Sequence, residues 1–476
     1  MNRSMIGAFA LLAPVAQAQE PTGTGKPDME KPNVIYVFAD QWRGQEVGYM
    51  GNVNVRTPNI DRLAGESRIM TNMVSTCPVS GPHRASLLTG TYPLTNGVFY
   101  NDKPMAEGLC GMGDAFKAAG YNTAYIGKWH IDGHGRDSFI PKERRLGFDY
   151  WKVRECTHKY NDSFYYADTP DTLYWQGYDA IAQTEDAVNY IRHADRTKPY
   201  VLFLSWGPPH DPYDTAPEAY KKLYADRSGI KLRENVSEQD AFRARRMLSG
   251  YYAHIAALDD CMGRIMDALD ATGQKENTIL VFTSDHGDML MSHGKVNKQQ
   301  PFDESILVPF IMRYPKRFGT ESRRLEIPMG TPDIMPTLLS LSGARIPKTV
   351  EGKDRSDYLL TGKTPRDTSA LIMCVVPFHQ WNYARGGYEY RGLRTPRYTY
   401  VRTLQGPAML FDNVADPYQQ KNLIADDRYR DLAGKLDKEL QQRLRKMNDR
   451  FLSGPEYMKM WNYTFDAGDE IKQTEK

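Results

Sequence analysis

The feature of the sequence that most constrains the fold is an uninterrupted apolar run, Asn33–Ala39 (NVIYVFA), rich in β-branched and aromatic residues. A run without polar alternation is typical of a β-strand that is buried on both faces. Similar runs occur at Thr123–Gly127, Tyr200–Trp206, Asn277–Thr283 and Val308–Met312. A sheet of such strands needs helices against both faces, because each face is apolar.

Helical patterns lie between these runs. Two helices are predicted to begin at Thr57-Pro58 and Thr331-Pro332, with threonine as the N-cap and proline at the first helical position. Alternation of strands and helices predicts an α/β fold with a doubly wound, mostly parallel sheet and helices on both faces. The clearest helical pattern is an apolar stripe with spacings of three and four residues, formed by Tyr251, Ile255, Leu258, Met262, Ile265 and Leu269.

The pattern changes after about residue 365. We expect a larger α/β domain over residues 20–365 and a smaller C-terminal α+β subdomain, with a short antiparallel sheet, over residues 366–476. Three short strand-like segments and one amphipathic helix indicate the subdomain: Tyr388–Tyr390, Tyr398–Arg402, Met409–Phe411 and Asp427 to about Met447.

Residues 1–19 have the pattern of a secretion signal, with Arg3, an apolar run at Ile6–Val15 and a small-residue cleavage site at Ala16-Gln17-Ala18. We expect the mature protein in a periplasm or outside the cell. Spanning a bilayer takes roughly 20 apolar residues, and no segment is that long, so no membrane insertion is expected. The formal charge of +2 comes without a basic stripe, which argues against a nucleic-acid partner.

The five cysteines are widely spaced and include no CxxC pair. An exported protein can hold a disulfide, but this spacing does not demand one, and the odd count leaves at least one thiol free. They are Cys77, Cys110, Cys156, Cys261 and Cys374.

Polar residues close the predicted strands. In open α/β sheets, ligands bind beyond the carboxyl ends of the strands, so these residues are the first candidates for a functional site. Four strand ends deliver acids, histidines and a lysine to one edge: Asp40-Gln41, Lys128 with His130, His210, and Asp285-His286.

The segment Ser80-Gly81-Pro82-His83-Arg84 continues into a helical stretch that ends in Leu-Thr-Gly. It resembles the signature of the formylglycine-dependent sulfatases of the alkaline-phosphatase-like superfamily, in which a reactive Cys or Ser precedes a Pro and then an Arg. A reactive residue at a helix N-terminus lies where exposed N–H groups favour an anion, and Arg84 adds a cation. Cys77 competes as the reactive residue, but Val79 and Gly81 stand in place of the proline and arginine, which favours Ser80.

The resemblance covers nearly the whole mature chain. Further blocks follow in family order, and together they resemble exported bacterial glycan sulfatases: Pro32–Asp40, Thr57–Leu63, Gly127–His130, Pro209-His210, Ser284–Gly287, Asp333–Leu338 and Leu410–Leu423.

This resemblance implies one calcium ion per active site, held by Asp40, Gln41, Asp285 and His286, with the side chain of Ser80 completing the set. Oxygen-rich ligation suits a hard cation, whereas the histidine leaves room for another divalent ion. Much of the family has Asp at the second position. Gln41 removes one negative charge, which should weaken metal binding.

The resemblance also implies that a sulfatase-maturation enzyme oxidises Ser80 to 3-oxoalanine (formylglycine). One hydroxyl of the hydrated aldehyde would attack sulfur, and the other would later expel the sulfate. Some bacterial maturation systems convert serine as well as cysteine. The open alternative is a serine that replaces a native cysteine in an inert protein.

Roles for the remaining residues follow from the same resemblance. Lys128 and Arg84 would hold the hydrated aldehyde, and His130 would accept its proton. His210 is predicted to be the general acid for the leaving alcohol. Lys298 is predicted to clamp the sulfate, with Lys295 as the alternative.

Lys128, His210 and Lys298 are also predicted to bind substrate. Asn101, His134 and Arg136 are further substrate-binding candidates, and an ordinary polar loop is the competing interpretation for these three.

The leading hypothesis is a sulfatase acting on a sulfated carbohydrate. The long His134–Tyr166 segment and the many aromatic residues would suit a glycan. A phosphonate or phosphodiester hydrolase of the same superfamily is one alternative, and a non-catalytic sulfoglycan-binding protein, with unmodified Ser80, is another. A two-zinc phosphomonoesterase would leave the motif at residue 80 unexplained. The sequence leaves open which sugar and which hydroxyl carry the sulfate.

Overall fold

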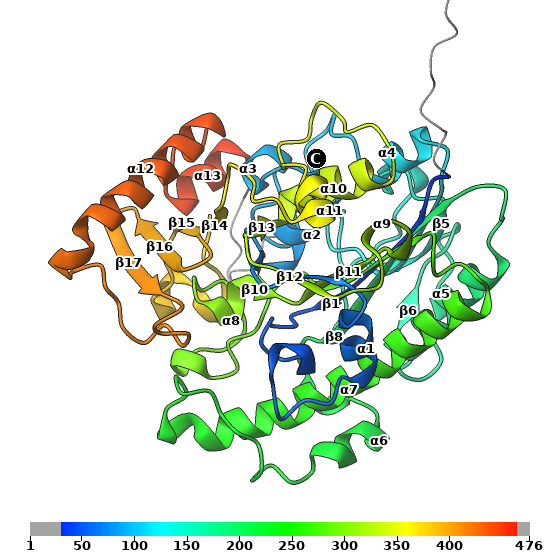
Figure 1. Ribbon diagram of the computed structural model, residues 1–476, viewed down its shortest axis with the longest axis horizontal. Helices are drawn as coiled ribbons and strands as arrows, with labels where there is room; N and C mark the ends of the chain where they lie inside the picture. The colour runs from blue at the N-terminus through cyan, green and yellow to red at the C-terminus, as the bar shows by residue number, and fades with distance from the viewer. Residues whose placement is uncertain (1–29, 464–476) are drawn as a thin grey trace, which may run out of the picture. The chain divides into compact units, whose positions relative to one another are not determined.

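The predicted apolar run forms β1 (Asn33–Asp40), which lies in the middle of an eight-stranded sheet. The structure, a computed structural model, describes residues 30–463 (Figure 1), so the predicted signal at residues 1–19 lies outside the described residues. β1 pairs in parallel with β8 (Tyr200–Pro209) on one side and with β9 (Thr278–Ser284) on the other. The prediction of a parallel arrangement around this run is confirmed.

The strand order of the large sheet is β12-β2-β11-β9-β1-β8-β4-β5. All of its pairings are parallel except those of β11, which runs antiparallel to both neighbours. The strands not yet introduced are β2 (Arg68–Met70), β4 (Asn122–Lys128), β5 (Tyr150–Arg154), β11 (Phe310–Arg313) and β12 (Arg323–Leu325).

The predicted strand Val308–Met312 is in fact two strands in two sheets. β10 (Leu307–Val308) joins a three-stranded sheet with β3 (Met73–Val74) and β13 (Met329–Gly330), whereas β11 joins the large sheet. Pro309 stands between them, and proline has no N–H with which to continue a strand ladder.

The pairing of β1 with β8 is irregular near its carboxyl end. Phe38 lies opposite Ser205, whereas Asp40 lies opposite Pro209, so a step of two residues on β1 matches a step of four on β8. The chain of β8 therefore runs past the end of β1 and leads directly into His210.

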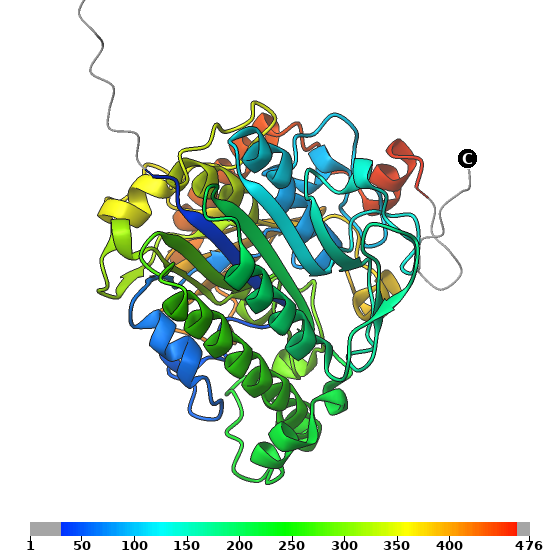
Figure 2. The same ribbon diagram turned by 90° about the vertical axis from the view of Figure 1, so that its right-hand side faces the viewer.

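Side chains of β1 alternate between the two faces of the sheet. Ile35 and Val37 belong to one hydrophobic cluster, with α1 (Pro58–Ala64), α5 (Asp179–His193) and α7 (Ala241–Ala271). Tyr36 and Phe38 belong to the other, with α2 (Ser80–Thr89), α4 (Met112–Ala118) and α10 (Ile334–Leu341). Figure 2 shows α5 and α7 along one face of the sheet. The predicted apolar stripe of α7 is fully buried.

The two Thr-Pro pairs begin helical turns in different ways. Thr57 is the N-cap residue of α1, as predicted, but its hydroxyl bonds to Gly48 N and to the Asp61 carboxylate rather than capping the helix. Thr331 lies inside a 3-10 turn, Thr331–Asp333, that precedes α10, so its prediction as an N-cap is wrong.

After α10 the chain forms an antiparallel sheet of β14 (Ala370–Cys374), β15 (Tyr390–Arg394), β16 (Tyr398–Thr403) and β17 (Gly406–Asp412). Its first strand was not predicted, and β15 begins where the predicted strand Tyr388–Tyr390 ends. α12 (Arg430–Lys446) lies across this sheet (Figure 1). Its leucines Leu436, Leu440 and Leu444 are buried in the same hydrophobic cluster as the sheet.

The remaining helices are short and connect these layers. Within the described residues, no helix combines the length and apolar character that crossing a bilayer needs, and all five cysteines carry free thiols. The remaining elements are α3 (Pro93–Asn96), β6 (Phe164–Tyr165), β7 (Leu173–Tyr174), α6 (Glu218–Lys221), α8 (Asp303–Ile306), α9 (Pro315–Phe318), α11 (Ser356–Thr361) and α13 (Gly454–Met460).

Candidate active site

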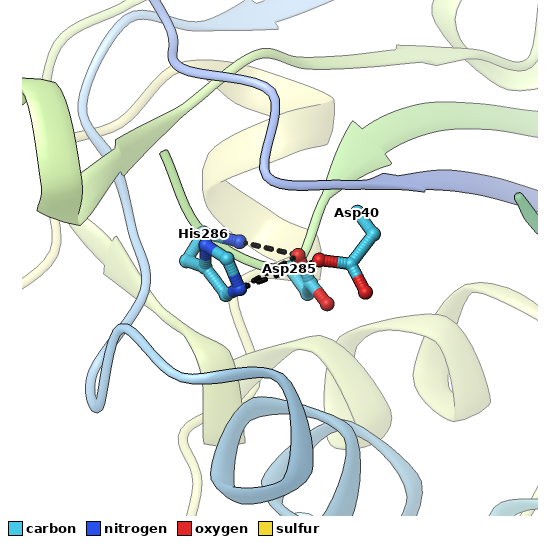
Figure 3. Close-up of side chains that lie close together, drawn as sticks. All are labelled: Asp40, Asp285 and His286. Atoms are coloured by element: carbon cyan, nitrogen blue, oxygen red, sulfur yellow. Dashed lines mark hydrogen bonds and ion pairs between the residues drawn. The ribbon is translucent and has the colours of Figure 1, made fainter. Parts of the chain in front are cut away.

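Three potential metal ligands converge beyond the ends of β1 and β9. Asp40 is the last residue of β1, and Asp285 and His286 follow β9, its neighbour in the sheet. The Nε2 atom of His286 lies 3.5 Å from a carboxylate oxygen of Asp40 and 3.5 Å from one of Asp285. Figure 3 shows the three side chains pointing toward one another, and all are fully buried.

Gln41 adds a fourth polar group. Its backbone has a left-handed φ of 69°, a strained conformation for glutamine. The amide nitrogen donates to Asp288 at 2.8 Å and to Asp211 at 3.4 Å, while the amide oxygen is buried without a hydrogen bond. A buried acceptor without a donor is costly unless something else satisfies it.

This donor set fits a divalent cation. Two carboxylates and an amide oxygen are the ligands that hard cations prefer. The Nδ1 of His286 hydrogen-bonds to the carbonyl of Gly287 at 2.9 Å, so the lone pair of Nε2 is left facing Asp40 and Asp285. Burial lowers the pKa of His286 to about 4, which keeps the ring neutral and able to ligate.

Ser80 lies at the first residue of α2, beside this cluster. Its hydroxyl is 3.3 Å from both carboxylate oxygens of Asp40 and 3.0 Å from Nε2 of His286. Cys77, the competing candidate, lies instead in the hydrophobic cluster of the C-terminal sheet, where burial raises the pKa of its thiol to about 12. The structure therefore brings Ser80, and not Cys77, to the candidate site.

Lys298 and His210 complete the side of the site that faces the Ser80 hydroxyl. The ammonium of Lys298 is 3.4 Å from Ser80 Oγ and 3.2 Å from His210 Nε2. The Nδ1 of His210 hydrogen-bonds to the carbonyl of Asp211 at 2.8 Å, which leaves Nε2 as the nitrogen that faces the site. Lys295, the alternative to Lys298, is exposed.

Arg84 and Lys128 are buried beside the two carboxylates. Lys128 donates to Asp40 at 2.6 Å, and the guanidinium of Arg84 bonds to Asp285 at 3.0 Å and to Asp40 at 3.3 Å. Burial would raise the pKa of Asp40, but the charges around it, with Lys128 the largest, hold that pKa well below its ordinary value. The carboxylate is therefore ionised, and the two cations balance the two acids.

The remaining predicted residues lie on two loops, Asn101 on the loop after α3 and His130, His134 and Arg136 on the loop after β4. His130 hydrogen-bonds to Asp102 at 3.2 Å, and Arg136 forms a two-pronged ion pair with the same carboxylate. Asn101 accepts a hydrogen bond from the backbone N–H of Gly81, so it holds the first turn of α2. His134, half exposed, bonds to the carbonyl of Asp132. Within residues 30–463, the side chains of Asn101, His130 and His134 form no hydrogen bond or ion pair with Ser80.

Several residues at the site were not predicted. The ring of His158 stacks on His210, with centroids 4.6 Å apart and planes at 12°. Ser205 accepts a hydrogen bond from Arg84 at 2.6 Å, and Asn297 donates to Asp211 at 2.8 Å. Asn297 could have been found from its position next to Lys298, but His158 lies in a segment whose sequence has no regular pattern.

The comparisons with known proteins agree with this geometry. The family model described as Sulfatase matches residues 32–344, and one described as N-sulphoglucosamine sulphohydrolase, C-terminal, matches residues 292–446. An ulvan-active sulfatase of Formosa agariphila is 46% identical over 459 residues, covering 95% of this chain and 87% of the relative. An endo-4-O-sulfatase of Bacteroides thetaiotaomicron is 31% identical, covering 88% and 93% of the two chains.

A solved structure from work on glycosaminoglycan metabolism in Bacteroides thetaiotaomicron has the same fold. It superposes with a TM-score of 0.80 and 29% identity, covering 90% of this chain and 99% of that one. A match of the family model to well over half of the chain, together with near full-length relatives, identifies the family. The chain belongs to the sulfatase family and is a sulfuric ester hydrolase.

Proposed function

We propose that this chain is an exported, calcium-dependent sulfatase that removes sulfate from ulvan after Ser80 has been converted to 3-oxoalanine by a sulfatase-maturation enzyme. The observation that carries the proposal is the convergence on one hydroxyl, that of Ser80, of Lys298 at 3.4 Å, His286 at 3.0 Å and Asp40 at 3.3 Å. Export rests on the secretion-signal pattern of residues 1–19.

The charge of the site supports an anionic substrate. Asp40 and Asp285 are balanced by Arg84 and Lys128, and Lys298 adds a further cation at the face of Ser80. A sulfate ester brought to this face would be bound by Lys298, and its negative charge would be stabilised in a buried, low-dielectric environment.

Calcium would be held by Asp40, Asp285, His286 and the unbonded amide oxygen of Gln41. When bound, it would polarise a sulfate oxygen and add positive charge at the site. Arg84 and Lys128 would keep the carboxylates ionised, and Arg84 is itself held in place by hydrogen bonds to the Lys128 carbonyl and to Ser205.

His210 and Lys298 would act together on the leaving group. Because Nδ1 of His210 is committed to the Asp211 carbonyl, only Nε2 can exchange a proton with a substrate. The 3.2 Å hydrogen bond from Lys298 reaches that same nitrogen. Burial and the neighbouring Lys298 hold the pKa of His210 well below its ordinary value, so Nε2 accepts this hydrogen bond. The proton that reaches the alcohol oxygen as the ester bond to sulfur breaks would therefore come from the Lys298 ammonium, through Nε2.

Ulvan enters the proposal through the 46% identical relative, whose name describes activity on ulvan. The test uses full-length protein co-expressed with a maturation enzyme, with calcium present, and measures inorganic sulfate released from ulvan, from glycosaminoglycans and from an aryl phosphonate. Release of sulfate from ulvan in preference to the other substrates is expected. Hydrolysis of the phosphonate alone would replace the proposal with a phosphonate hydrolase.

The state of residue 80 is measured on the same protein by peptide mass spectrometry. The mass of 3-oxoalanine at Ser80 is expected in active material. An unmodified serine in a preparation that turns over rapidly would contradict the proposed chemistry, and an unmodified serine with tight ulvan binding and no turnover would indicate a sulfoglycan-binding protein.

A further inference from the structure

A hollow of about 760 Å³ adjoins the site on the side of α7. It lies between the first half of α7 and the segment that runs from Asp211 through α6 to Arg227, and α6 packs beside α7 (Figure 1). Two of its lining residues, Asp211 and Asn297, directly follow His210 and precede Lys298 in sequence. The lining of the hollow therefore includes the sequence neighbours of His210 and Lys298, the two side chains that face Ser80.

The wall of this hollow carries more basic than acidic side chains, five against three. Lys221 is paired with Glu218. The other four, Lys222, Arg227, Arg243 and Arg246, are exposed, and none has a hydrogen-bond or ion-pair partner among residues 30–463. An isolated surface cation needs no explanation, but four unpaired cations around one concave surface create a positive potential that attracts anions.

The helix α7 presents part of this wall as one face. Arg246 and Met247 follow Arg243 by three and four residues, and Gly250 follows these two by four and three, so all four share a side of the helix. A Cβ atom on Gly250 would lie 2.2 Å from the carbonyl oxygen of Tyr213. Glycine here therefore allows the chain that follows His210 to pack directly on α7.

We infer that this hollow is a second substrate subsite, which binds an anionic group, sulfate or carboxylate, on a sugar next to the one that is desulfated. The inference rests on the proposed function, because it takes a polyanionic glycan as the substrate. Arginine binds carboxylate and sulfate oxygens through two parallel N–H groups, and Arg243 and Arg246 offer two such forks on one helix face. The enzyme should therefore prefer an oligosaccharide with several anionic groups over a small sulfate ester.

The test compares the protein as isolated with the double variant Arg243→Gln/Arg246→Gln. The control, Arg345→Gln/Lys348→Gln, removes the same charge from exposed residues that follow α10, on the other face of the large sheet. Each protein is assayed with an ulvan oligosaccharide and with 4-nitrophenyl sulfate, which is too small to reach the hollow.

Loss of two charge-assisted contacts predicts a KM for the oligosaccharide that is roughly tenfold higher in the Arg243/Arg246 variant, with kcat unchanged. The KM for 4-nitrophenyl sulfate should stay the same, and the control variant should match the unmodified protein with both substrates. Added salt should narrow the difference in oligosaccharide KM between the Arg243/Arg246 variant and the unmodified protein, because the two arginines are exposed to solvent. An oligosaccharide KM that is equal in all three proteins would overturn the inference.

A calorimetric titration of the same oligosaccharide into the Ser80→Ala protein, with and without the two arginine substitutions, separates this inference from the proposed function. Weaker binding without the arginines supports the subsite even if no sulfate is ever released. The absence of sulfate release would contradict the proposed function but not the subsite. Equal affinities in the two Ser80→Ala proteins, together with sulfate release by the protein that keeps Ser80, would support the proposed function and reject the subsite.

Discussion

Two groups of charges in this molecule are held in opposite ways. At the ends of β1 and β9, Asp40, Asp285, Arg84 and Lys128 are buried and each is paired, with distances between 2.6 and 3.3 Å. Around the hollow beside α7, four cations are exposed and have no partner in the described part of the chain. Burying an unpaired charge costs several kcal/mol, so charges that the fold must bury are placed together with their counter-charges. Exposed cations carry no such cost and stay available to a ligand.

The largest expected effect lies at Ser80, which hydrogen-bonds to Asp40 of the buried group. Replacing Ser80 by alanine should reduce sulfate release by roughly 10³-fold or more, because it removes the residue that would carry the nucleophile. Sulfate release and thermal unfolding are measured in parallel. An unchanged melting temperature would assign the loss to chemistry, and turnover that survives the substitution would rule out residue 80 as the nucleophile.

The next effect concerns stability and calcium together. Asp285→Asn should destabilise the protein by about 3 kcal/mol, since it removes one of the two carboxylates that neutralise the buried guanidinium of Arg84. Added calcium should raise the melting temperature of the unmodified protein more than that of the variant.

The matched control for this prediction is Asp303→Asn. Asp303 is also buried and paired, with Arg394 at 3.0 Å, but it lies outside the candidate metal ligands. This variant should lose stability yet keep the full response to calcium. Identical calcium responses in the two variants would show that the ion does not bind at Asp285.

Glu155, a buried carboxyl near the site, tests the pairing of buried charges from the opposite direction, because one of its oxygens has no partner. Glu155 accepts hydrogen bonds from the N–H groups of Asp132 and Gly133, but its second oxygen is buried without a partner. Burial, which outweighs the opposing effect of His130, raises the pKa of Glu155 from 4.5 to about 7. The native state therefore binds more protons than the unfolded state between these two pH values.

Stability should consequently fall as pH rises from about 4.5 to 7, by roughly 2–3 kcal/mol from this group. Glu155→Gln keeps an oxygen for the two N–H groups and cannot ionise, so the variant should be the more stable protein at pH 8 and lose its advantage at pH 4. Denaturant unfolding at the two pH values measures the difference. A variant that is less stable at both would show that the ionised carboxylate is satisfied in the native state.

The smallest effect belongs to the exposed group. Arg246→Gln should change the free energy of unfolding by less than about 0.5 kcal/mol, as is usual for an exposed side chain without partners. Arg84→Gln, which removes an arginine of the buried group, should cost several kcal/mol by the same measurement. Similar losses in both variants would erase the distinction between the two groups.

The sequence predicts the parts of the molecule that depend on local pattern. Runs such as Asn33–Ala39 predict buried strands because period and composition decide burial, and the residues that end them lie together because parallel strands share an edge. The stacking of His158 on His210 could not be predicted, since it joins residues from two loops through contacts that leave no periodic trace. The division of the run around Pro309 depends on which sheet each half meets, which is also a long-range property.

The uneven pairing of β8 with β1 sets the position of His210. Because four residues of β8 span the distance covered by two of β1, the surplus chain carries His210 forward to the level of Asp40 and Lys298. A strand advances by about 3.3 Å per residue, so a register without the surplus would withdraw the imidazole by several ångströms and leave every side chain of the sheet core in place. An insertion or deletion at Gly207 would therefore shift His210 relative to Lys298, and with it the proton delivery proposed for this pair.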